Sequence, residues 1–264
     1  SVVGIDLVAQ EDSIIVTRTR NGEVATLSKS IGYNALPGDE LSFSLPAQNR
    51  GVLPSPSTEM EIVVPDGDSS RQAVPSIEAY SEQRIVIDWI VPEQTTIGNQ
   101  TLTFTVDPDE LITGDANRSN NQATVDVFIG RAPNASISID TGNYTFEDVF
   151  IDASSSFDPD GGDVECRFEI ESRPGLVDVI TTPDCAINWN WSDDGDWELR
   201  TVVTDNELDT TVLVSNVTIL NRAPYINLSH PTEIAVESSI TIDASDSGDI
   251  DTVSPSGQQV SVSW

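Results

Sequence analysis

Apolar residues recur at every second position through much of this 264-residue chain. Because a β-strand points successive side chains to opposite faces of its sheet, a period of two predicts strands with one buried and one polar face. No segment keeps a helical period for three turns. Pro, Gly, Asn and Asp, which favour turns, separate the alternating runs. We therefore expect an all-β chain built from β-sandwiches.

In residues 1–131 the alternation defines the strand faces that we expect to be buried. The polar stretch Asp66–Ala79 interrupts the pattern, so a flexible loop is predicted there. The expected inward residues are Leu41, Phe43 and Leu45; Met60, Ile62 and Val64; Ile85, Ile87, Trp89 and Val91; Leu102, Phe104 and Val106; and Ala123, Val125, Val127 and Ile129.

The same alternation continues through residues 132–222. Near its end the phase changes, because Val212 and Val214 have even numbers whereas Val217 and Ile219 have odd ones. A β-bulge near Ser215-Asn216 is predicted to restore the register. The other expected inward residues are Ala135, Ile137 and Ile139; Val149, Ile151 and Ala153; Cys166, Phe168 and Ile170; and Trp197, Leu199, Thr201 and Val203.

A second pattern has a period of 91 residues. Arg131-Ala132-Pro133 recurs as Arg222-Ala223-Pro224 (222 − 131 = 91), and Ile151-Asp152-Ala153-Ser154 recurs as Ile242-Asp243-Ala244-Ser245 (242 − 151 = 91). Equal spacing at two anchor points indicates a duplicated unit.

The repeat predicts domains at residues 1–131, 132–222 and 223–264. The third corresponds only to the first strands of the second, because Val260, Val262 and Trp264 align with its third strand. Such a piece cannot complete a sandwich by itself. We expect either that the polypeptide continues beyond residue 264 or that strands of a neighbouring chain complete the domain.

Charge limits the classes of partner. The chain has 44 acidic and 12 basic residues, a formal net charge of −32, and Lys29 as its only lysine. Such a surface repels phosphate backbones and anionic lipids, so nucleic acid is not an expected partner. No run of 18 apolar residues is visible, so this segment is not expected to insert into a membrane. The charge suits salty or divalent-rich water, or simply an acidic soluble protein.

Cysteines and sequons indicate an extracellular or cell-surface glycoprotein. Cys166 and Cys185, 19 positions apart, could be two buried small residues, but we predict a disulfide, which would add about 3 kcal/mol of stability. No signal peptide is visible, so an export signal would lie outside the segment. Seven Asn-x-Ser/Thr sequons predict N-glycosylation, at Asn99, Asn117, Asn134, Asn143, Asn190, Asn216 and Asn227.

Several landmarks of residues 1–131 occur together. They are Ile5-Asp6-Leu7-Val8, Pro37-Gly38-Asp39, Asn49-Arg50-Gly51, Trp89, Gly98, Val106-Asp107-Pro108-Asp109 and Asn120-Asn121. In combination they resemble a CARDB domain, the cell adhesion related domain of bacteria and archaea, which implies an Ig-like fold and a bacterial or archaeal host. Asp107, Asp109, Asn120 and Asn121 could hold a cation, but we favour turn chemistry for them.

Residues 132–222 carry a different set of motifs. They are Ala153-Ser154-Ser155-Ser156-Phe157-Asp158-Pro159-Asp160-Gly161, Asp194-Gly195-Asp196-Trp197-Glu198-Leu199 and Val203-Thr204-Asp205-Asn206. Their order and spacing resemble a PKD domain, an Ig-like fold frequent in microbial surface proteins and secreted hydrolases. The third strand departs from that family, because it has Cys166-Arg167-Phe168-Glu169 where Trp-Asp-Phe-Gly-Asp-Gly is usual. Together the two resemblances predict tandem Ig-like β-sandwiches.

The PKD resemblance implies a calcium site. PKD-like domains of secreted collagenases bind calcium at positions that correspond here to Asn134, Asp158, Asp160 and Asp205. The Asp-Pro-Asp turn itself presents several carboxylate oxygens over a short span, as a hard cation requires. A plain solvated turn is the alternative, and glycosylation at Asn134 would compete with calcium binding there.

The sequence contains no recognisable catalytic motif. His230 is the only histidine, and no Gly-x-Ser-x-Gly elbow, phosphate-binding loop or His-Glu-x-x-His motif occurs. The chain is therefore not expected to be an enzyme. We predict a structural or adhesive surface protein, part of a stalk, filament or sheath, that binds copies of itself, other surface proteins or glycans. The alternative is an accessory spacer or binding region of a secreted hydrolase.

Overall fold

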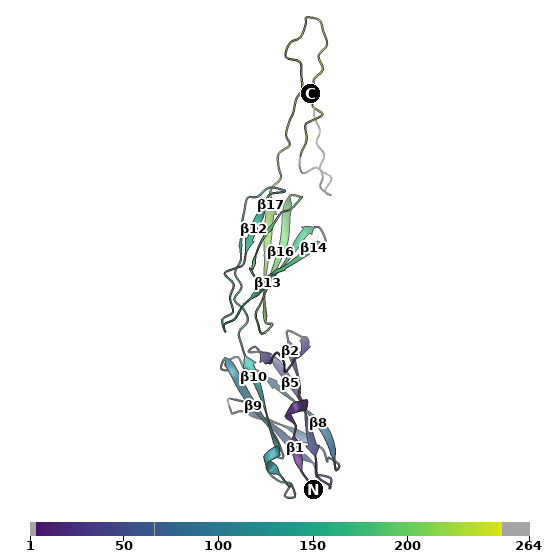
Figure 1. Ribbon diagram of the computed structural model, residues 1–264, viewed down its shortest axis with the longest axis vertical. Coiled ribbons are helices and arrows are strands. Elements are labelled where there is room, and N and C mark those ends of the chain that lie inside the picture. Colours follow the sequence, from purple (N-terminus) through teal and green to yellow (C-terminus); the bar gives the residue numbers. More distant parts are fainter. Residues whose placement is uncertain (1–3, 66, 250–264) are drawn as a thin grey trace. The chain divides into compact units, whose positions relative to one another are not determined.

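The structure is a computed structural model that describes residues 4–65 and 67–249. The chain divides into two compact units, residues 1–131 and 132–264. The fold is all-β, as the alternation predicts (Figure 1). In the described residues the helical segments are two 3-10 turns, η1 (Glu11–Ser13) and η2 (Arg118–Asn120). No helix in that part of the chain is long and apolar enough to cross a lipid bilayer.

The first unit is a sandwich of two five-stranded sheets. In one sheet the central strand β5 pairs with β1 and β2 along one edge and with β8 along the other, and β3 pairs with β2. The second sheet has the order β4-β10-β9-β6-β7. The first sheet holds β1 (Leu7–Ala9), β2 (Ile15–Arg20), β3 (Glu23–Thr26), β5 (Glu40–Asn49) and β8 (Ser81–Ile90); the second holds β4 (Tyr33–Ala35), β6 (Thr58–Val63), β7 (Ser69–Val74), β9 (Gly98–Val106) and β10 (Gln122–Ile129).

Both sheets contribute to one core. Every residue of this unit that the alternation places inward is buried. Phe43 of one sheet packs against Phe104 of the other, with ring centroids 5.3 Å apart. Truncating a fully buried phenylalanine costs about 3–5 kcal/mol, so this contact fixes the two sheets together.

The prediction of a flexible loop across Asp66–Ala79 is wrong for its central part. Ser69–Val74 forms β7, which pairs antiparallel with β6 at the edge of the second sheet. Its residues are mostly polar and exposed. The strand is therefore held by backbone hydrogen bonds and by Arg71, which contacts Glu59 and Glu61 on β6 at 3.2 and 3.0 Å.

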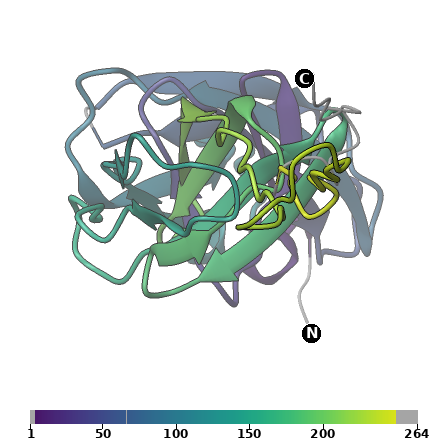
Figure 2. The same ribbon diagram turned by 90° about the horizontal axis from the view of Figure 1, so that it is seen from above.

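The second unit packs a three-stranded sheet against a four-stranded one, the architecture of an Ig-like sandwich. The strands β13 and β16 lie side by side at the centre of the larger sheet (Figure 1 and Figure 2). The smaller sheet has the order β11 (Ser138–Ile139), β12 (Val149–Asp152), β15 (Ala186–Trp189); the larger has the order β14 (Leu176–Thr182), β13 (Glu165–Arg173), β16 (Gly195–Thr204), β17 (Thr210–Ile219).

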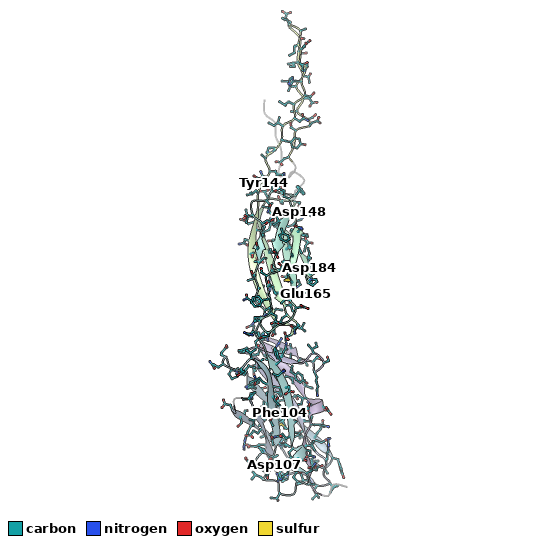
Figure 3. All side chains as sticks on the ribbon, turned by 60° about the vertical axis from the view of Figure 1, so that its left-hand side comes forward. Phe104, Asp107, Tyr144, Asp148, Glu165 and Asp184 are labelled. Carbon is teal, nitrogen blue, oxygen red and sulfur yellow. A yellow bond between two sulfur atoms is a disulfide. The ribbon has the colours of Figure 1, made fainter. Side chains whose placement is uncertain are left out.

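A disulfide crosses this core. It joins Cys166 on β13 to Cys185, the residue directly before β15, so it ties one sheet to the other. Figure 3 labels Glu165 and Asp184, which precede the two cysteines. Both cysteines are buried among residues such as Phe168 and Trp191.

The predicted bulge in the last strand does not form. β17 pairs with β16 without interruption from Gly195↔Ile219 to Thr204↔Thr210. Val217 and Ile219 face the core, and the unbroken alternation turns Val212 and Val214 outward, 39% and 61% exposed. The prediction was wrong because it assumed that every valine in the strand faces inward.

Contacts at the start of the second unit recur 91 residues later. The backbone bridges Asn134↔Phe157 and Ser138↔Asp152 reappear as Tyr225↔Gly248 and Ser229↔Asp243. The Ser156 hydroxyl that bridges Ser136 has its counterpart in the Ser247 hydroxyl that bridges Asn227. Residues 223–249 thus repeat the opening hydrogen bonds of the second unit. Val260, Val262 and Trp264 lie outside the described residues, and the domain limit at residue 222 stays a prediction.

Candidate functional site

Buried carboxylates gather at one end of the second unit. Asp205 directly follows β16 and Asp209 directly precedes β17, so both belong to the turn that joins these strands. The Asp209 amide donates to Oδ1 of Asp205 at 2.8 Å, and the Asp205 amide donates to the Asp209 carbonyl at 3.1 Å. Asp158, in the turn between β12 and β13, is the third member. All three are more than nine-tenths buried.

The charges of this carboxylate cluster act on one another. Burial is the main cause that raises the pKa of Asp205 to about 6, and the negative charges of Asp209, Glu207 and Asp158 raise it further. The hydrogen bond from the Asp209 amide lowers this pKa in part. Burial, and next the charge of Asp158, also raise the pKa of Glu207. Either a proton or a hard cation would relieve this repulsion.

One oxygen of the cluster lacks a donor. Asp158 accepts the Asp160 amide on Oδ1 at 2.8 Å, but its Oδ2 is buried and has no hydrogen-bond partner. A Cβ on Gly162 would lie 2.1 Å from Oδ1 of Asn206 and 3.2 Å from Oδ2 of Asp158. Glycine suits residue 162 because its φ of 140° is one that other residues rarely adopt, and because a side chain there would displace that of Asn206 in the β16–β17 turn.

The structure brings together part of the predicted calcium set. Asp158 and Asp205 share the cluster, and Asp160 contacts Asp158 through its backbone amide. Asn134 is exposed, and its backbone pairs with Phe157 at 2.8 and 3.0 Å. Within residues 4–65 and 67–249, no group of three or more His, Cys, Asp or Glu side chains is arranged to hold a metal ion.

Sequence reasoning missed Glu207 and Asp209. The signal was available, because Asp205, Glu207 and Asp209 place three acids at alternate positions of one turn. The turn closes tightly, with Leu208 in the left-handed region at φ 67°. Only the fold shows that Asp158, about 50 residues earlier, reaches the same place.

Acidic residues at one end of the first unit have a different role. Asp107 has a positive φ of 53° and is almost fully buried. Its carboxylate accepts hydrogen bonds from the Thr58 hydroxyl, the Leu111 and Ile112 amides and the Arg118 guanidinium, at 3.0 to 3.2 Å. These donors use both oxygens, so Asp107 organises the loop that follows β9.

Neighbouring acids of this loop region are also engaged. Asp109 forms a two-pronged contact with Arg71 at 2.7 and 3.0 Å, which lowers the pKa of Asp109. The side-chain amide of Asn120 donates to Asp6 at 3.0 Å, and that of Asn121 donates to Asp115 at 2.9 Å. Asp107 shows the turn chemistry that the sequence predicts, because it accepts the Leu111 and Ile112 amides, whereas Asp109 and Asn120 contact side chains far away in the sequence.

The sequons differ in accessibility. Asn99, Asn117, Asn134, Asn190, Asn216 and Asn227 are exposed. Asn143 differs because its side-chain nitrogen is buried without a hydrogen-bond partner, and Thr145 of the same sequon is fully buried. An oligosaccharide could not be attached to Asn143 once this unit has folded.

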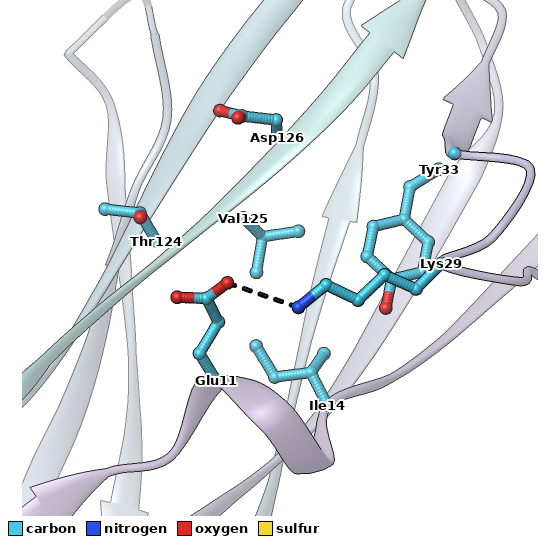
Figure 4. Close-up of a pocket in the computed structure, with 8 residues that line it drawn as sticks. Glu11, Ile14, Lys29, Tyr33, Thr124, Val125 and Asp126 are labelled. Atoms are coloured by element: carbon cyan, nitrogen blue, oxygen red, sulfur yellow. Dashed lines mark hydrogen bonds and ion pairs between the residues drawn. The ribbon is translucent and has the colours of Figure 1, made fainter.

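A cavity of about 260 Å³ lies in the first unit, lined by residues from three separate segments. At its rim the Lys29 ammonium lies 3.4 Å from Oε1 of Glu11 (Figure 4). Both side chains are more than half exposed, so this ion pair contributes little to stability. The remaining lining residues are Ile14, Gly32, Tyr33, Thr124, Val125 and Asp126.

Several solved structures are similar to parts of this chain. A CARDB domain from Pyrococcus furiosus, crystallised in complex with di-metal ions, is 19% identical with a TM-score of 0.36, and the match covers 49% of this chain and 91% of that one. A domain of a putative cell surface protein from Methanosarcina acetivorans is 23% identical with a TM-score of 0.35, covering 48% and 92%. Fibronectin(III)-like modules of Clostridium thermocellum CbhA are 14% identical with a TM-score of 0.38, covering 71% and 89%.

No curated protein sequence matches the chain. The family model for CARDB matches residues 23–125, which span β3 to the middle of β10. The matched region contains the landmark motifs other than Ile5-Asp6-Leu7-Val8 and most of the first core. The first unit of this chain therefore contains a CARDB domain.

Proposed function

We propose that this chain is an extracellular, non-catalytic part of a cell-surface or adhesion protein, in which Ig-like sandwiches joined in series form a stalk, filament or sheath. The observation that carries the proposal is a CARDB domain followed by a second Ig-like sandwich whose opening contacts recur 91 residues later. Units joined in this way gain length with each copy. The disulfide supports an oxidising location outside the cytoplasm.

The second unit is proposed to be a PKD-type domain. Its support is the position of the motif residues, because the Asp158-Pro159-Asp160 turn and the Asp205 corner lie at the same end of the sandwich. Trp197 is buried and Trp191 fills the core beside the disulfide, as a small Ig-like sandwich requires.

Calcium is proposed to stiffen this end of the second unit. Oδ2 of Asp158 has no hydrogen-bond donor, and the carboxylate of Asp205 is buried near other negative charges. Glu207 and Asp209 lie close enough for their charges to act on Asp205. An oxygen-rich set of this kind fits a hard cation, with a dissociation constant of about 10⁻⁴ to 10⁻³ M in extracellular modules. Bound calcium would join the β12–β13 turn to the β16–β17 turn.

A calcium titration monitored by thermal unfolding tests this site. Millimolar calcium should raise the melting temperature of the wild type but not that of Asp158→Asn. The matched control is Asp163→Asn, because Asp163 is an exposed acid of the same turn and its loss should leave the response intact. An equal response in all three proteins would remove the proposed site.

Surface location is tested on intact cells of the source organism. Antibodies raised against residues 1–222 should label unbroken cells, and electron microscopy should place the label on stalks, filaments or a sheath. Labelling only after lysis would contradict the proposal. Recovery of the chain in the medium, covalently continuous with a hydrolase, would instead support the accessory role.

Mass analysis of the native protein would show which of the six exposed sequons carry sugar.

A further inference from the structure

A second cavity of the first unit lies at one end of its sandwich. It has a volume of about 270 Å³ and lies where β8 ends and β9 begins, between the two sheets to which these strands belong. Trp89 on β8 lines it from one sheet, and Gln100 on β9 lines it from the other. Residues of the loop between these strands complete most of the lining. The remaining described lining residues are Pro65, Pro92, Gln94, Thr95 and Thr96.

The described lining of this cavity, here called the Trp89 cavity, carries no charged side chain. It differs in this from the chain as a whole, which has 44 acidic and 12 basic residues. Glu93 belongs to the same loop, but its carboxylate lies beside the turn before β5, because a Cβ on Gly38 would be 3.2 Å from its Oε1. An ion in a neutral cavity loses hydration without meeting an opposite charge, and the acidic surface repels anions. A neutral ligand therefore fits this cavity best.

Trp89 gives the cavity both an apolar surface and a hydrogen-bond donor. The residue is 9% exposed and belongs to the core, so only part of its ring lines the cavity. Its indole N–H has no hydrogen-bond partner among the described residues, and its nitrogen is not one of the buried unpartnered atoms in that part of the chain. The nitrogen therefore reaches solvent, so a ligand beside the ring can accept its hydrogen.

The polar side chains of the lining are positioned by a closed loop. The Thr95 amide donates to the Pro92 carbonyl at 3.0 Å, and Nε2 of Gln100 donates to the Thr96 carbonyl at 2.6 Å. The second contact ties β9 to the loop and fixes the Gln100 amide beside the cavity. Amides and hydroxyls both donate and accept hydrogen bonds. Gln94, Thr95 and Thr96 therefore suit a ligand with several hydroxyl groups.

We propose that the Trp89 cavity binds one neutral hexopyranose ring of a glycan. A pyranose combines hydroxyls, which match the amides and hydroxyls of the loop, with C–H surfaces, which match Trp89 and the two prolines. The volume lies just below the roughly 300–1,000 Å³ of most small-molecule sites, so the cavity admits a single sugar rather than a chain. With so few contacts, the dissociation constant should be about 1–10 mM. The inference rests on the proposed adhesive role for its setting and deepens it by naming a ligand class.

NMR of residues 1–264 labelled with heavy nitrogen tests the cavity. The chain has five tryptophans, and Trp89→Phe identifies the Trp89 indole N–H signal by its loss. Methyl α-glucoside, methyl α-mannoside, methyl β-galactoside and N-acetylglucosamine are each added up to about 50 mM, and at least one should shift this signal saturably. The Trp197 indole, which donates to the Asp193 carbonyl at 3.3 Å in the second unit, should not move. A Trp89 signal that none of these sugars shifts would overturn the proposal.

Gln94→Ala removes one polar group of the cavity and should weaken sugar binding about fivefold. The matched control is Gln122→Ala, because Gln122 is an exposed glutamine on β10 that does not line the cavity. This control should keep the dissociation constant within about twofold of the wild type. Melting curves show whether each variant is folded. Equal binding by Gln94→Ala and the wild type would contradict the assignment.

Anionic sugars test the role of the neutral lining. Glucuronate and galacturonate should shift the Trp89 signal less than the neutral sugars do, because the acidic chain repels them. Equal shifts would show that the cavity does not select neutral rings. Failure of all sugar binding would leave the surface location standing, because antibody labelling of intact cells tests that location separately.

Discussion

Two buried aspartates, Asp107 and Asp158, have different roles in this chain. Asp107 has donors on both oxygens and holds a loop, whereas Asp158 keeps one buried oxygen without a donor. A buried carboxylate that is fully hydrogen-bonded stabilises its loop, and one that is not costs free energy until a proton or cation arrives. Stability is therefore expected to respond differently to changes at the two sites.

Asp107→Ala should destabilise the first unit by about 2–4 kcal/mol, because it removes one carboxylate from four donors and leaves Arg118 without its carboxylate partner. Urea unfolding of the wild type and the variant measures the loss. Asp109→Ala is the matched control in the same loop. Its carboxylate is exposed, so its removal should cost much less, and equal losses would contradict the assigned role of Asp107.

Asp205→Asn should change how stability depends on pH. The pKa of Asp205 is raised from 3.8 to about 6 in the folded chain, so between these values the folded state binds a proton that the unfolded state does not. The wild type therefore loses stability from this group as pH rises from about 4 to about 6, and the loss persists above pH 6.

Asparagine keeps the oxygen that accepts the Asp209 amide but has no charge to bury. Without calcium, the free energy of unfolding of Asp205→Asn should exceed that of the wild type by an amount that grows as pH rises from 4 to 7. After allowance for solvent screening, this difference should reach on the order of 1–2 kcal/mol. Melting curves in chelator at several pH values provide the measurement. Parallel curves for the two proteins would show that Asp205 is not the group responsible.

At the scale of strands, alternation was a reliable guide where one face is buried. Every residue that it placed inward on β5, β6, β8, β9 and β10 is buried, because each of these strands has one face on the core, but it left out Ala47 of β5, which is fully buried too. It failed for β7, whose residues Ser69 to Gln72 carry no apolar signal at a sheet edge. It also misplaced Val212 and Val214, because the sequence does not show that a valine is exposed.

The candidate site was only partly predictable for a related reason. Asp158 and Asp205 were found through short motifs, whose residues are local in sequence. The approach of the two turns depends on Gly162 and on pairing between distant strands, which no local pattern encodes. Glu207 and Asp209 could have been included from their spacing, but the orphaned oxygen of Asp158 is visible only in three dimensions.

Reduction of the disulfide should destabilise the second unit. The bond between Cys166 and Cys185 closes a loop with a sequence separation of 19, which corresponds to about 3 kcal/mol in the chain-entropy description. Cys166→Ser together with Cys185→Ser, or treatment with a thiol reductant, should lower the unfolding midpoint of this unit. Because the first unit contains no cysteine, its midpoint provides the internal control, and a shift in both units would contradict a local effect.

At the scale of the whole molecule, charge is the dominant property. A net charge of −32 on 264 residues leaves a large excess of carboxylates, which lie in turns and on about half of the strands of the described residues. Repulsion of this size opposes compactness and is weakened by salt, since the screening length falls from about 30 Å at 0.01 M to about 3 Å at 1 M.

The melting temperature should therefore rise by several degrees as sodium chloride increases from 0.01 to 0.5 M. Calorimetry over a salt series measures the shift. Calcium chloride at 1 mM, compared with sodium chloride of equal ionic strength, separates specific binding from screening. A melting temperature independent of salt would show that the acidic surface does not limit stability.

The covalent link between the two sheets also sets how this chain would respond to pulling. If tension unravelled the second unit, the residues between Cys166 and Cys185 could not extend, because the bond carries the force past them. At about 3.4 Å per residue, a separation of 19 corresponds to roughly 65 Å of hidden length. A reducing environment would release that length, so the chain would extend further under tension with the disulfide reduced than with it oxidised.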